Sequence, residues 1–598
     1  MNCLLNCLLF LKQHISLFLA SFFAIIFWSV LVVEKKFNFQ NGIGAFILSA
    51  ALFVSFFFSW KIIKKYSEEK KIGYILYSTI LIFNCCWLIA CFRVSSIAWD
   101  TWNMYDMSRY VFSDFGYMDN IRQHIINTHY EMAFPPLFPI LMAVVNFIFD
   151  CGASAATFVC GIFSIWIVSL SALVGKKVGG ILPFALCAFV FLCGSCYCWL
   201  VKTGISQVLN FAFLFLIVNL LLNFKLNIKN VVSLAFFSSL GLMCRFDFLA
   251  VVVVCFTFVT INALREKKIK ETLKYSSLFA LTTLLFCSPL IIYSIKQFNK
   301  FFVTDNGRRL INVVDTRAAT FFPETIPVKT LFNDFWEWLP AFFERFTTSC
   351  IALIKCLVLY SVFFETILTS LLILLLAKFM QKDAFIMLKQ NKNISFNILF
   401  ILVIFLGLEL LYLLTGYDDI RYHLPFAFLI SYMFLKHCLE PIFGAFLNLS
   451  HFSSKCRLLK YLFVVLFILF STVKCVHSNM KTFVNVFYSD RNYAKEMYLT
   501  KEEVHVKKYI EDNLKTICFY RGEKHTDSFS FLRFATLSRL SWDITPNNIS
   551  DDNVGEFAKA FDINYLYSTN REITNMFKSK MDVYETGIPF LYKIDLKK

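Results

Sequence analysis

The sequence predicts an α-helical polytopic membrane protein of about 13 transmembrane helices with a small C-terminal α/β domain. Of its 598 residues, 58% are hydrophobic and only 17% are charged, and the mean hydropathy is +0.62. Soluble globular chains are about 45–50% apolar and about 25% charged. Apolar runs of roughly 20 residues recur along the chain, and each is long enough to cross a hydrocarbon core of about 30 Å. After residue 478 the apolar runs shorten and charged residues become frequent, which predicts a domain outside the membrane.

The apolar runs divide the chain into three parts. We expect two additional N-terminal helices in 1–73, a main membrane module in 74–478 with outer loops at 93–133 and 297–346, and the α/β domain in 479–598. The first run follows Lys12 and lacks a small-residue cleavage pattern, which is typical of a retained signal anchor. The predicted spans lie near 15–33, 42–60, 74–92, 134–150, 152–174, 181–200, 205–224, 231–262, 275–296, 350–377, 395–414, 424–440 and 459–477.

The net charge of +17 comes largely from short loops between the spans. Four basic loops, at 61–71, 265–274, 378–392 and 455–460, fall on one side of a thirteen-span topology. The positive-inside rule makes that side cytoplasmic. The N-terminus is then expected inside. The parts expected outside are the loops 93–133 and 297–346, the 418–423 segment and the C-terminal domain. Lys176 and Lys177 fall on the opposite side from the other basic loops. This distribution excludes nucleic acid as the reason for the positive charge.

The C-terminal domain has local signals of both helices and strands. Thr500 and Thr569 each precede a Glu by three residues, a capping-box pattern that starts helices. Short β-prone runs occur at 517–520, 563–567 and 590–594. The 20 cysteines lie mostly inside apolar runs, so they are better interpreted as small buried hydrophobes than as a disulfide framework.

The first outer loop carries the candidate catalytic acids. Asp100 lies eight residues after the 74–92 span, and Asp106 lies in the same loop. A carboxylate at the outer membrane surface can act as a general base on an incoming hydroxyl, although outer loops also carry acids for topology and solubility. The loop ends at Pro135-Pro136, and proline in a first helical turn fixes the angle at which the chain enters a helix.

Two further segments place charges near the membrane surface or within it. Arg245 and Asp247 interrupt an apolar run, where charges are costly and are usually paired or functional. Arg421 precedes Tyr422 and His423 at the start of a late span, where a guanidinium can bind a phosphate with two hydrogen bonds. The alternatives are a structural ion pair for Arg245 and Asp247, and anchoring to lipid headgroups for Arg421.

These segments together resemble the GT-C superfamily of integral-membrane glycosyltransferases, such as protein O-mannosyltransferases and aminoarabinose transferases. In that family the first outer loop opens with an acid, continues with a tyrosine and a short helix, and closes with a Pro-Pro-Leu-Tyr-Pro-like sequence. The later segments are similar to the family's Gly-Leu-x-x-x-Arg-x-acid and Arg-Tyr-x-Leu-Pro motifs. The matching residues are Asp100, Tyr105, Arg109, Pro135, Pro136, Arg245, Arg421, Tyr422 and His423.

The resemblance implies transfer of a sugar from a polyprenyl-phosphate-linked donor to a lipid, glycan or protein acceptor, with inversion, at the extracytoplasmic face of a bacterial plasma (inner) membrane. Asp100 would be the base, with Asp106 as the competing candidate. Arg421, Arg245, Arg308 and Arg309 would neutralise the donor phosphate. No Walker or GxGxxG phosphate loop is present in a soluble segment, which favours a lipid-linked sugar over a nucleotide sugar.

Three other interpretations stay open at this stage. A transporter or flippase of a lipid-linked glycan would line its path with intramembrane charges such as Arg245, Asp247, Lys355 and Glu409. A surface-polysaccharide polymerase or ligase would use the same donor class. Some GT-C proteins bind a divalent metal ion, and His124, His129 and His423 could join carboxylates as ligands, but none has a zinc-type spacing such as HExxH.

Overall fold

The computed structural model of the chain describes most of the helical part and the end of the C-terminal domain. The described residues are 2–35, 39–67, 71–93, 101, 104, 108, 135–149, 151–152, 154–265, 269–298, 335–359, 396–415, 419–434, 436, 519–521, 551, 554–555, 558, 565–568 and 570–596. The chain divides into two compact units. The first comprises Met1–Ser96, Val144–Pro289 and Phe343–Phe487, and the second comprises Ile97–Ala143, Leu290–Phe342 and Tyr488–Lys598.

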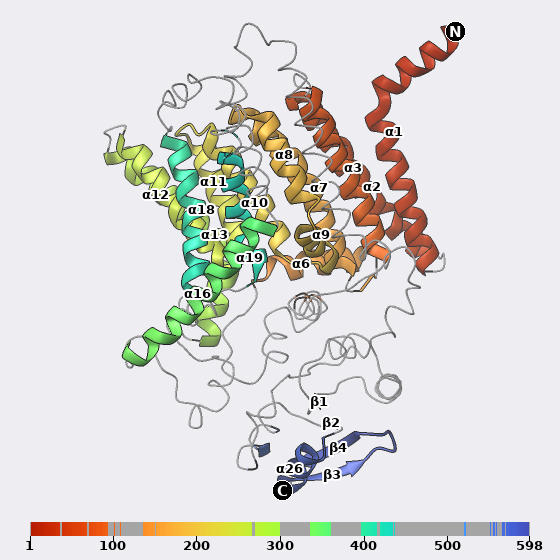
Figure 1. Cartoon of the computed structure of the whole chain (residues 1–598), viewed down its shortest axis with the longest axis vertical. Coiled ribbons are helices and arrows are strands. Elements are labelled where there is room, and N and C mark those ends of the chain that lie inside the picture. Colours follow the sequence, from red (N-terminus) through yellow and green to blue (C-terminus); the bar gives the residue numbers. More distant parts are fainter. Residues whose placement is uncertain are drawn as a thin grey trace, which may run out of the picture. The chain divides into compact units, whose positions relative to one another are not determined.

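The first unit is a bundle of apolar helices (Figure 1). Its helices, together with those that cross its boundary, are α1 (Asn2–Lys35), α2 (Phe39–Ser67), α3 (Lys71–Arg93), α6 (Leu137–Ile148), α7 (Ser154–Lys177), α8 (Ile181–Leu192), α9 (Ser195–Thr203), α10 (Gln207–Leu222), α11 (Ile228–Leu242), α12 (Leu249–Arg265), α13 (Ile269–Phe298), α16 (Phe335–Leu359), α18 (Phe396–Thr415) and α19 (Ile420–Phe434).

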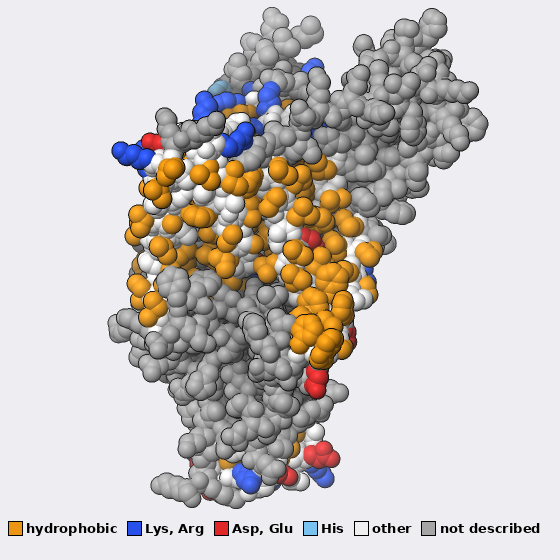
Figure 2. Space-filling view, turned by 90° about the vertical axis from the view of Figure 1, so that its left-hand side faces the viewer, with side chains coloured by type: hydrophobic (Ala, Val, Ile, Leu, Met, Phe, Trp, Pro, Cys, Tyr) orange, Lys and Arg blue, Asp and Glu red, His pale blue; other side chains and the backbone are white. Residues whose placement is uncertain are grey.

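Six of the described helices are long and apolar enough to cross a membrane, or seven if the bent pair α8–α9 is one span. Large apolar side chains such as Phe18, Ile25, Phe46 and Leu285 are exposed on them. Figure 2 shows apolar side chains covering much of the described helical part on one face. An exposed apolar surface of this extent indicates an integral membrane protein. The predicted total of 13 helices stays a prediction, because the span near 459–477 lies outside the described residues.

Small residues bring α7 into the centre of the bundle, where it packs against α2, α3 and α10. Its buried positions include Ala155, Gly161, Ser164 and Gly175. A Cβ at Gly161 would run into the Leu88 side chain of α3, so a larger residue there would force Leu88 to move. Membrane helices without a hydrophobic driving force between them associate through such small-residue contacts.

The predicted span at 181–200 is a broken helix, with a bend of 55° between α8 and α9. Gly194 at the break has an extended backbone, φ −69° and ψ 150°. Two backbone carbonyls of α9 accept hydrogen bonds from neighbouring side chains: the Cys198 carbonyl from Trp87 Nε1 at 2.9 Å and the Lys202 carbonyl from Thr157 Oγ1 at 3.1 Å. Irregular backbone is tolerated inside a membrane protein when neighbouring groups satisfy it in this way.

Two predicted spans are wrong. The 231–262 run is two helices, α11 and α12, which pack against one another and are joined by the α11–α12 turn at residues 243–248. Helix α11 ends at Leu242, and Arg245 then adopts an extended conformation, φ −153° and ψ 136°, which turns the chain towards α12. The 134–150 run contains only the 12-residue α6, which at 1.5 Å per residue is about 18 Å long and too short to cross the bilayer.

Side-chain contacts define two ends of the bundle. At the first, which we call the basic end, Lys177 Nζ donates to the Asn219 carbonyl at 3.0 Å and Lys436 contacts the Val178 carbonyl. The C-terminal ends of α7, α10 and α19 therefore meet there. At the opposite end, which we call the site end, the Thr157 contact joins the start of α7 to the end of α9, and Cys244 Sγ donates to the Ser206 carbonyl at 3.7 Å.

With these two spans corrected, Lys176 and Lys177 no longer fall on the opposite side of the membrane from the other basic loops. With α6 too short to cross and α11–α12 counted as two helices, the parity of the later spans is unchanged. Lys176, Lys177 and Lys225 now fall on the same side as Arg265, at the basic end. Figure 2 shows Lys and Arg side chains gathered beyond one edge of the apolar surface.

The second unit contains a four-stranded sheet of order β1-β2-β4-β3. Strand β1 (Phe519–Arg521) pairs parallel to β2 (Tyr565–Tyr567), and β4 (Leu591–Leu596) pairs antiparallel to both β2 and β3 (Met581–Glu585). Helix α26 (Arg571–Lys580) begins at Asn570, whose side chain accepts from Glu572 N at 2.9 Å. The cap is therefore Asn570, one residue later than the predicted Thr569, and Thr500 lies outside the described residues.

Candidate functional site

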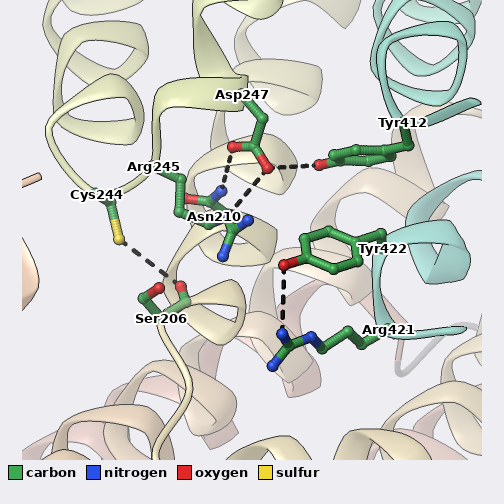
Figure 3. A network of polar contacts seen from close by, with 8 residues as sticks. All are labelled: Ser206, Asn210, Cys244, Arg245, Asp247, Tyr412, Arg421 and Tyr422. Atoms are coloured by element: carbon green, nitrogen blue, oxygen red, sulfur yellow. Dashed lines mark hydrogen bonds and ion pairs between the residues drawn. The ribbon is translucent and has the colours of Figure 1, made fainter. Parts of the chain in front are cut away.

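The α11–α12 turn positions the first two charged residues of the site. Arg245 N donates to the Gly241 carbonyl at 2.9 Å, and Phe248 N donates to the Arg245 carbonyl at 3.2 Å. A Cβ at Gly241 would run into the Phe248 ring, so glycine is required where the turn folds back on α11. Figure 3 shows the Arg245 and Asp247 side chains pointing toward one another, with Asp247 also facing Tyr412.

Asp247 is the centre of a buried polar network and is only 1% exposed. It accepts from Arg245 Nε at 3.0 Å, from Tyr412 Oη of α18 at 2.9 Å and, at the longer distance of 3.4 Å, from Asn210 Nδ2 of α10. Burying a carboxylate without hydrogen-bond donors costs free energy, and these donors offset that cost. The predicted ion pair of Arg245 and Asp247 is therefore present, and Asp247 fixes the orientation of the guanidinium.

The start of α19 provides the second arginine. Asp419 Oδ1 accepts from the backbone N of Arg421 at 3.0 Å, while Asp419 Oδ2 lies 2.9 Å from Arg421 Nε. Arg421 Nη2 also donates to Tyr422 Oη at 3.3 Å. An acid at a helix N-terminus caps its first N–H groups, so Asp419 both starts α19 and holds the Arg421 side chain.

The ring of Tyr422 brings the two arginines together. The Arg245 Cζ atom lies 5.2 Å from the ring centroid and the Arg421 Cζ atom lies 5.0 Å from it. The electron-rich face of an aromatic ring attracts a guanidinium within about 6 Å. Both arginine side chains are mostly buried, at 15% and 14% exposure. Each guanidinium is paired with its own carboxylate, so the site has no excess of positive charge. What it offers an anion is two guanidinium groups held on one ring, each with several N–H donors.

A second buried pair lies beside this network. His423 Nδ1 is 2.7 Å from Glu409 Oε1 of α18, and both side chains are almost completely buried. The His423 ring also meets the Tyr412 ring edge to face, with centroids 6.4 Å apart. His423 thus faces α18 in the described structure. Lys355, which the transporter interpretation grouped with Glu409, is exposed on α16.

Sequence reasoning missed Asn210 and Tyr412, which complete the partners of Asp247. The signal for Asn210 was present in the Gln207-x-x-Asn210 spacing, which places two amides on one face of a helix whose other residues, apart from Asn219, are apolar. Tyr412 had no such signal, because a tyrosine in an apolar run is equally compatible with simple packing.

Several predicted site residues cannot be placed. Asp100, Asp106, Tyr105, Arg109, Arg308, Arg309, His124 and His129 lie outside the described residues. Pro135 and Pro136 are described and buried, and the Pro136 carbonyl accepts from Ile140 N at 3.0 Å as α6 begins. Within the described part of the chain, no three His, Cys, Asp or Glu side chains group as metal ligands.

Comparison with known proteins finds no matching family model and no matching curated protein sequence. Solved structures that are similar to the chain include the following three. ArnT from Cupriavidus metallidurans bound to undecaprenyl phosphate is 11% identical, with a TM-score of 0.49, over 87% of this chain and 97% of ArnT. Its apo state is 13% identical over the same shares, with a TM-score of 0.41.

The third is the archaeal oligosaccharyltransferase AglB from Archaeoglobus fulgidus, in complex with an inhibitory peptide and a dolichol-phosphate. It is 10% identical over 87% of this chain and 74% of AglB, with a TM-score of 0.47. The aminoarabinose transferases, to which the sequence motifs are similar, are represented among these structures by ArnT.

Proposed function

We propose that the chain is an integral-membrane glycosyltransferase that moves a sugar from a polyprenyl-phosphate-linked donor to an acceptor hydroxyl at the extracytoplasmic face. One observation carries the proposal. Arg245 and Arg421 were singled out from two separate sequence motifs as phosphate-binding residues, and both lie against the Tyr422 ring.

A phosphate suits this arrangement better than other anions. Guanidinium groups match phosphate oxygens with two parallel hydrogen bonds, and each such bond is charge-assisted. Asp247 and Asp419 hold the two guanidinium groups through their Nε atoms, so little side-chain freedom is lost on binding. The same two cations would stabilise the negative charge that develops on the phosphate as it leaves the sugar.

The proposed reaction is a single displacement. The Asp100 carboxylate takes the proton of the acceptor hydroxyl while the hydroxyl oxygen forms a bond to the anomeric carbon. The bond between that carbon and the phosphate oxygen breaks, and its electron pair leaves with the phosphate beside Arg421 and Arg245. Arg308 and Arg309 are proposed to assist, and Asp106 is the alternative base. Attack opposite the leaving group inverts the anomeric centre.

The direction of the bundle supports an extracytoplasmic site. The basic end carries Lys176, Lys177 and Arg265, and by the positive-inside rule it faces the cytoplasm. Helix α3 runs toward the site end, because Trp87 near its C-terminus donates to Cys198 of α9. The chain therefore leaves the bundle at the site end seven residues before Asp100. We place the protein in a bacterial plasma membrane with its C-terminal domain outside.

The test is glycosyl transfer by the purified full chain and by Asp100→Asn, with polyprenyl-phospho-sugars as donors and native membranes as acceptor. Loss of a general base lowers the rate by about 10²- to 10⁴-fold, and we expect Asp100→Asn to do so while it still binds the donor. Asp106→Asn is the matched control and should retain transfer.

The outcomes separate the alternatives. Transfer unaffected by Asp100→Asn but lost in Asp106→Asn would move the base to Asp106. A product that keeps the donor's anomeric configuration would contradict the single displacement. A wild type that binds the donor and moves it across a vesicle membrane without transfer would be a carrier and would overturn the proposal.

A further inference from the structure

We propose that Gln207 and Asn210, at the N-terminal turn of α10, form a subsite that binds hydroxyl groups of the donor sugar. The inference rests on the proposed function, since it assigns a place to the sugar beside the arginines proposed to bind its phosphate. No motif in the sequence resemblance includes either residue.

The two amides are buried with hydrogen-bonding capacity left unused. Gln207 is 4% exposed, and neither its Nε2 nor its Oε1 has a partner among the described residues. Asn210 is 8% exposed; its Nδ2 donates to Asp247, but its Oδ1 has no partner in the same part of the chain. Buried polar atoms are nearly always satisfied, because leaving them unpaired costs free energy. Three such atoms on one helix turn indicate a binding partner.

The amides lie next to the arginine network. Residues three apart on a helix share a face, so Gln207 lies on the face from which Asn210 reaches Asp247. The residue before Gln207, Ser206, accepts through its carbonyl from Cys244 Sγ, which directly precedes Arg245. The first turn of α10 therefore packs against the α11–α12 turn, as Figure 3 shows for Ser206, Asn210 and Arg245.

The unused atoms select the chemistry of the ligand. They comprise one amide NH₂, which donates, and two amide oxygens, which accept. A phosphodiester offers only acceptor oxygens and a polyprenyl chain offers neither donors nor acceptors, so each would leave the amide oxygens unpaired. A hydroxyl both donates and accepts, and neighbouring hydroxyls of a sugar can satisfy an amide nitrogen and oxygen together. The sugar of the donor is the part of that ligand with this pattern.

The test measures binding of polyprenyl phosphate and of polyprenyl-phospho-sugar to the full chain in lipid nanodiscs. Gln207→Leu removes the amide at similar volume. We expect it to weaken binding of the glycosylated lipid by about tenfold, the equivalent of one hydrogen bond, and to leave the binding of polyprenyl phosphate unchanged. Asn219→Leu, on the same helix 12 residues further along and so about 18 Å away, is the matched control and should change neither.

Analogues of the sugar that lack one hydroxyl provide a second test of the subsite. On the wild type, removal of one sugar hydroxyl should weaken binding by about tenfold, and the same analogue should bind Gln207→Leu no more weakly than the parent sugar does, because the two changes remove one interaction. If Gln207→Leu does not fold, Gln207→Met serves in its place.

Three results would overturn the subsite. The first is equal binding of the glycosylated lipid by wild type and variant, which is the result expected if the amides hold only water. The second is additive effects of the analogue and the substitution. The third is equal loss of both lipids in Gln207→Leu. A wild type that binds neither lipid overturns the proposed function itself, and the subsite with it.

Discussion

The α11–α12 turn and the contact between α18 and α19 each bury one carboxylate, but the two carboxylates differ in how many side chains bond to them. Asp247 in the turn accepts from three side chains on three segments. Glu409 of α18 meets His423 of α19 through one oxygen, and its Oε2 has no partner among the described residues. The first carboxylate is surrounded by donors and the second depends on a single neighbour.

This difference indicates which of the two carboxylates contributes more to the stability of the bundle. Arg245 is always charged, so its acid cannot be removed without leaving a cation in the bundle. An imidazole can be neutral, so His423 tolerates the loss of its partner better. We therefore expect the turn to need the Arg245–Asp247 ion pair for its stability. The Glu409–His423 pair aligns α19, which carries Arg421, and apolar residues could replace both of its members.

The largest effect should come from Asp247→Ala. The substitution leaves Arg245 mostly buried without its acid and removes the acceptor of Tyr412 and Asn210. Breaking a buried pair by removing one partner destabilises a protein by about 3–5 kcal/mol. We expect a clear fall in the thermal unfolding midpoint of the purified full chain. Asp247→Asn, which retains an acceptor oxygen, is the control and should lose less. Equal midpoints for Asp247→Ala and wild type would show that the turn does not depend on this pair.

The break between α11 and α12 shows what the sequence could and could not predict. Arg245 and Asp247 were identified from the sequence as costly charges inside an apolar run, yet the run was still predicted as one span. Hydropathy averages over a window, and the apolar residues on both sides outweigh two charges. The turn between the two helices depends on the extended backbone at Arg245 and on the close approach of Gly241 to Phe248, and hydropathy reports neither.

Local signals were more informative in the C-terminal domain. Strands β1, β2 and β4 overlap the three β-prone runs predicted from composition. Strand β3 was missed because its residues, Met581–Glu585, alternate weakly and follow α26 directly. For the candidate site, the sequence identified Arg245, Asp247 and Arg421 but not their shared contact with Tyr422, since that contact joins segments far apart in the chain.

A smaller effect should come from Glu409→Leu. It leaves the His423 ring nitrogen without its acceptor, a loss that we place at about 3 kcal/mol or less for a buried polar group. The double variant Glu409→Leu/His423→Phe should recover most of this stability, because both partners become apolar. By contrast, Asp247→Leu/Arg245→Met should recover little, because Tyr412 and Asn210 still lack their acceptor. Unfolding midpoints of the two double variants, each set against its single variant Glu409→Leu or Asp247→Leu, test the comparison. It is wrong if the two double variants recover to the same extent.

The smallest effect should come from Tyr412→Phe, which removes one of the three donors to Asp247 and leaves the ion pair in place. A hydrogen bond to a charged group contributes about 1.5 kcal/mol or more. Tyr77→Phe is the matched control, because Tyr77 is also fully buried but donates to a neutral acceptor, the Ser171 carbonyl, at 3.2 Å. Tyr77→Phe should therefore lower the free energy of unfolding by about 1 kcal/mol or less. If Tyr77→Phe lowers the unfolding midpoint as much as Tyr412→Phe does, the charge of Asp247 adds nothing to the Tyr412 hydrogen bond, and Tyr412 contributes no more than an ordinary buried tyrosine.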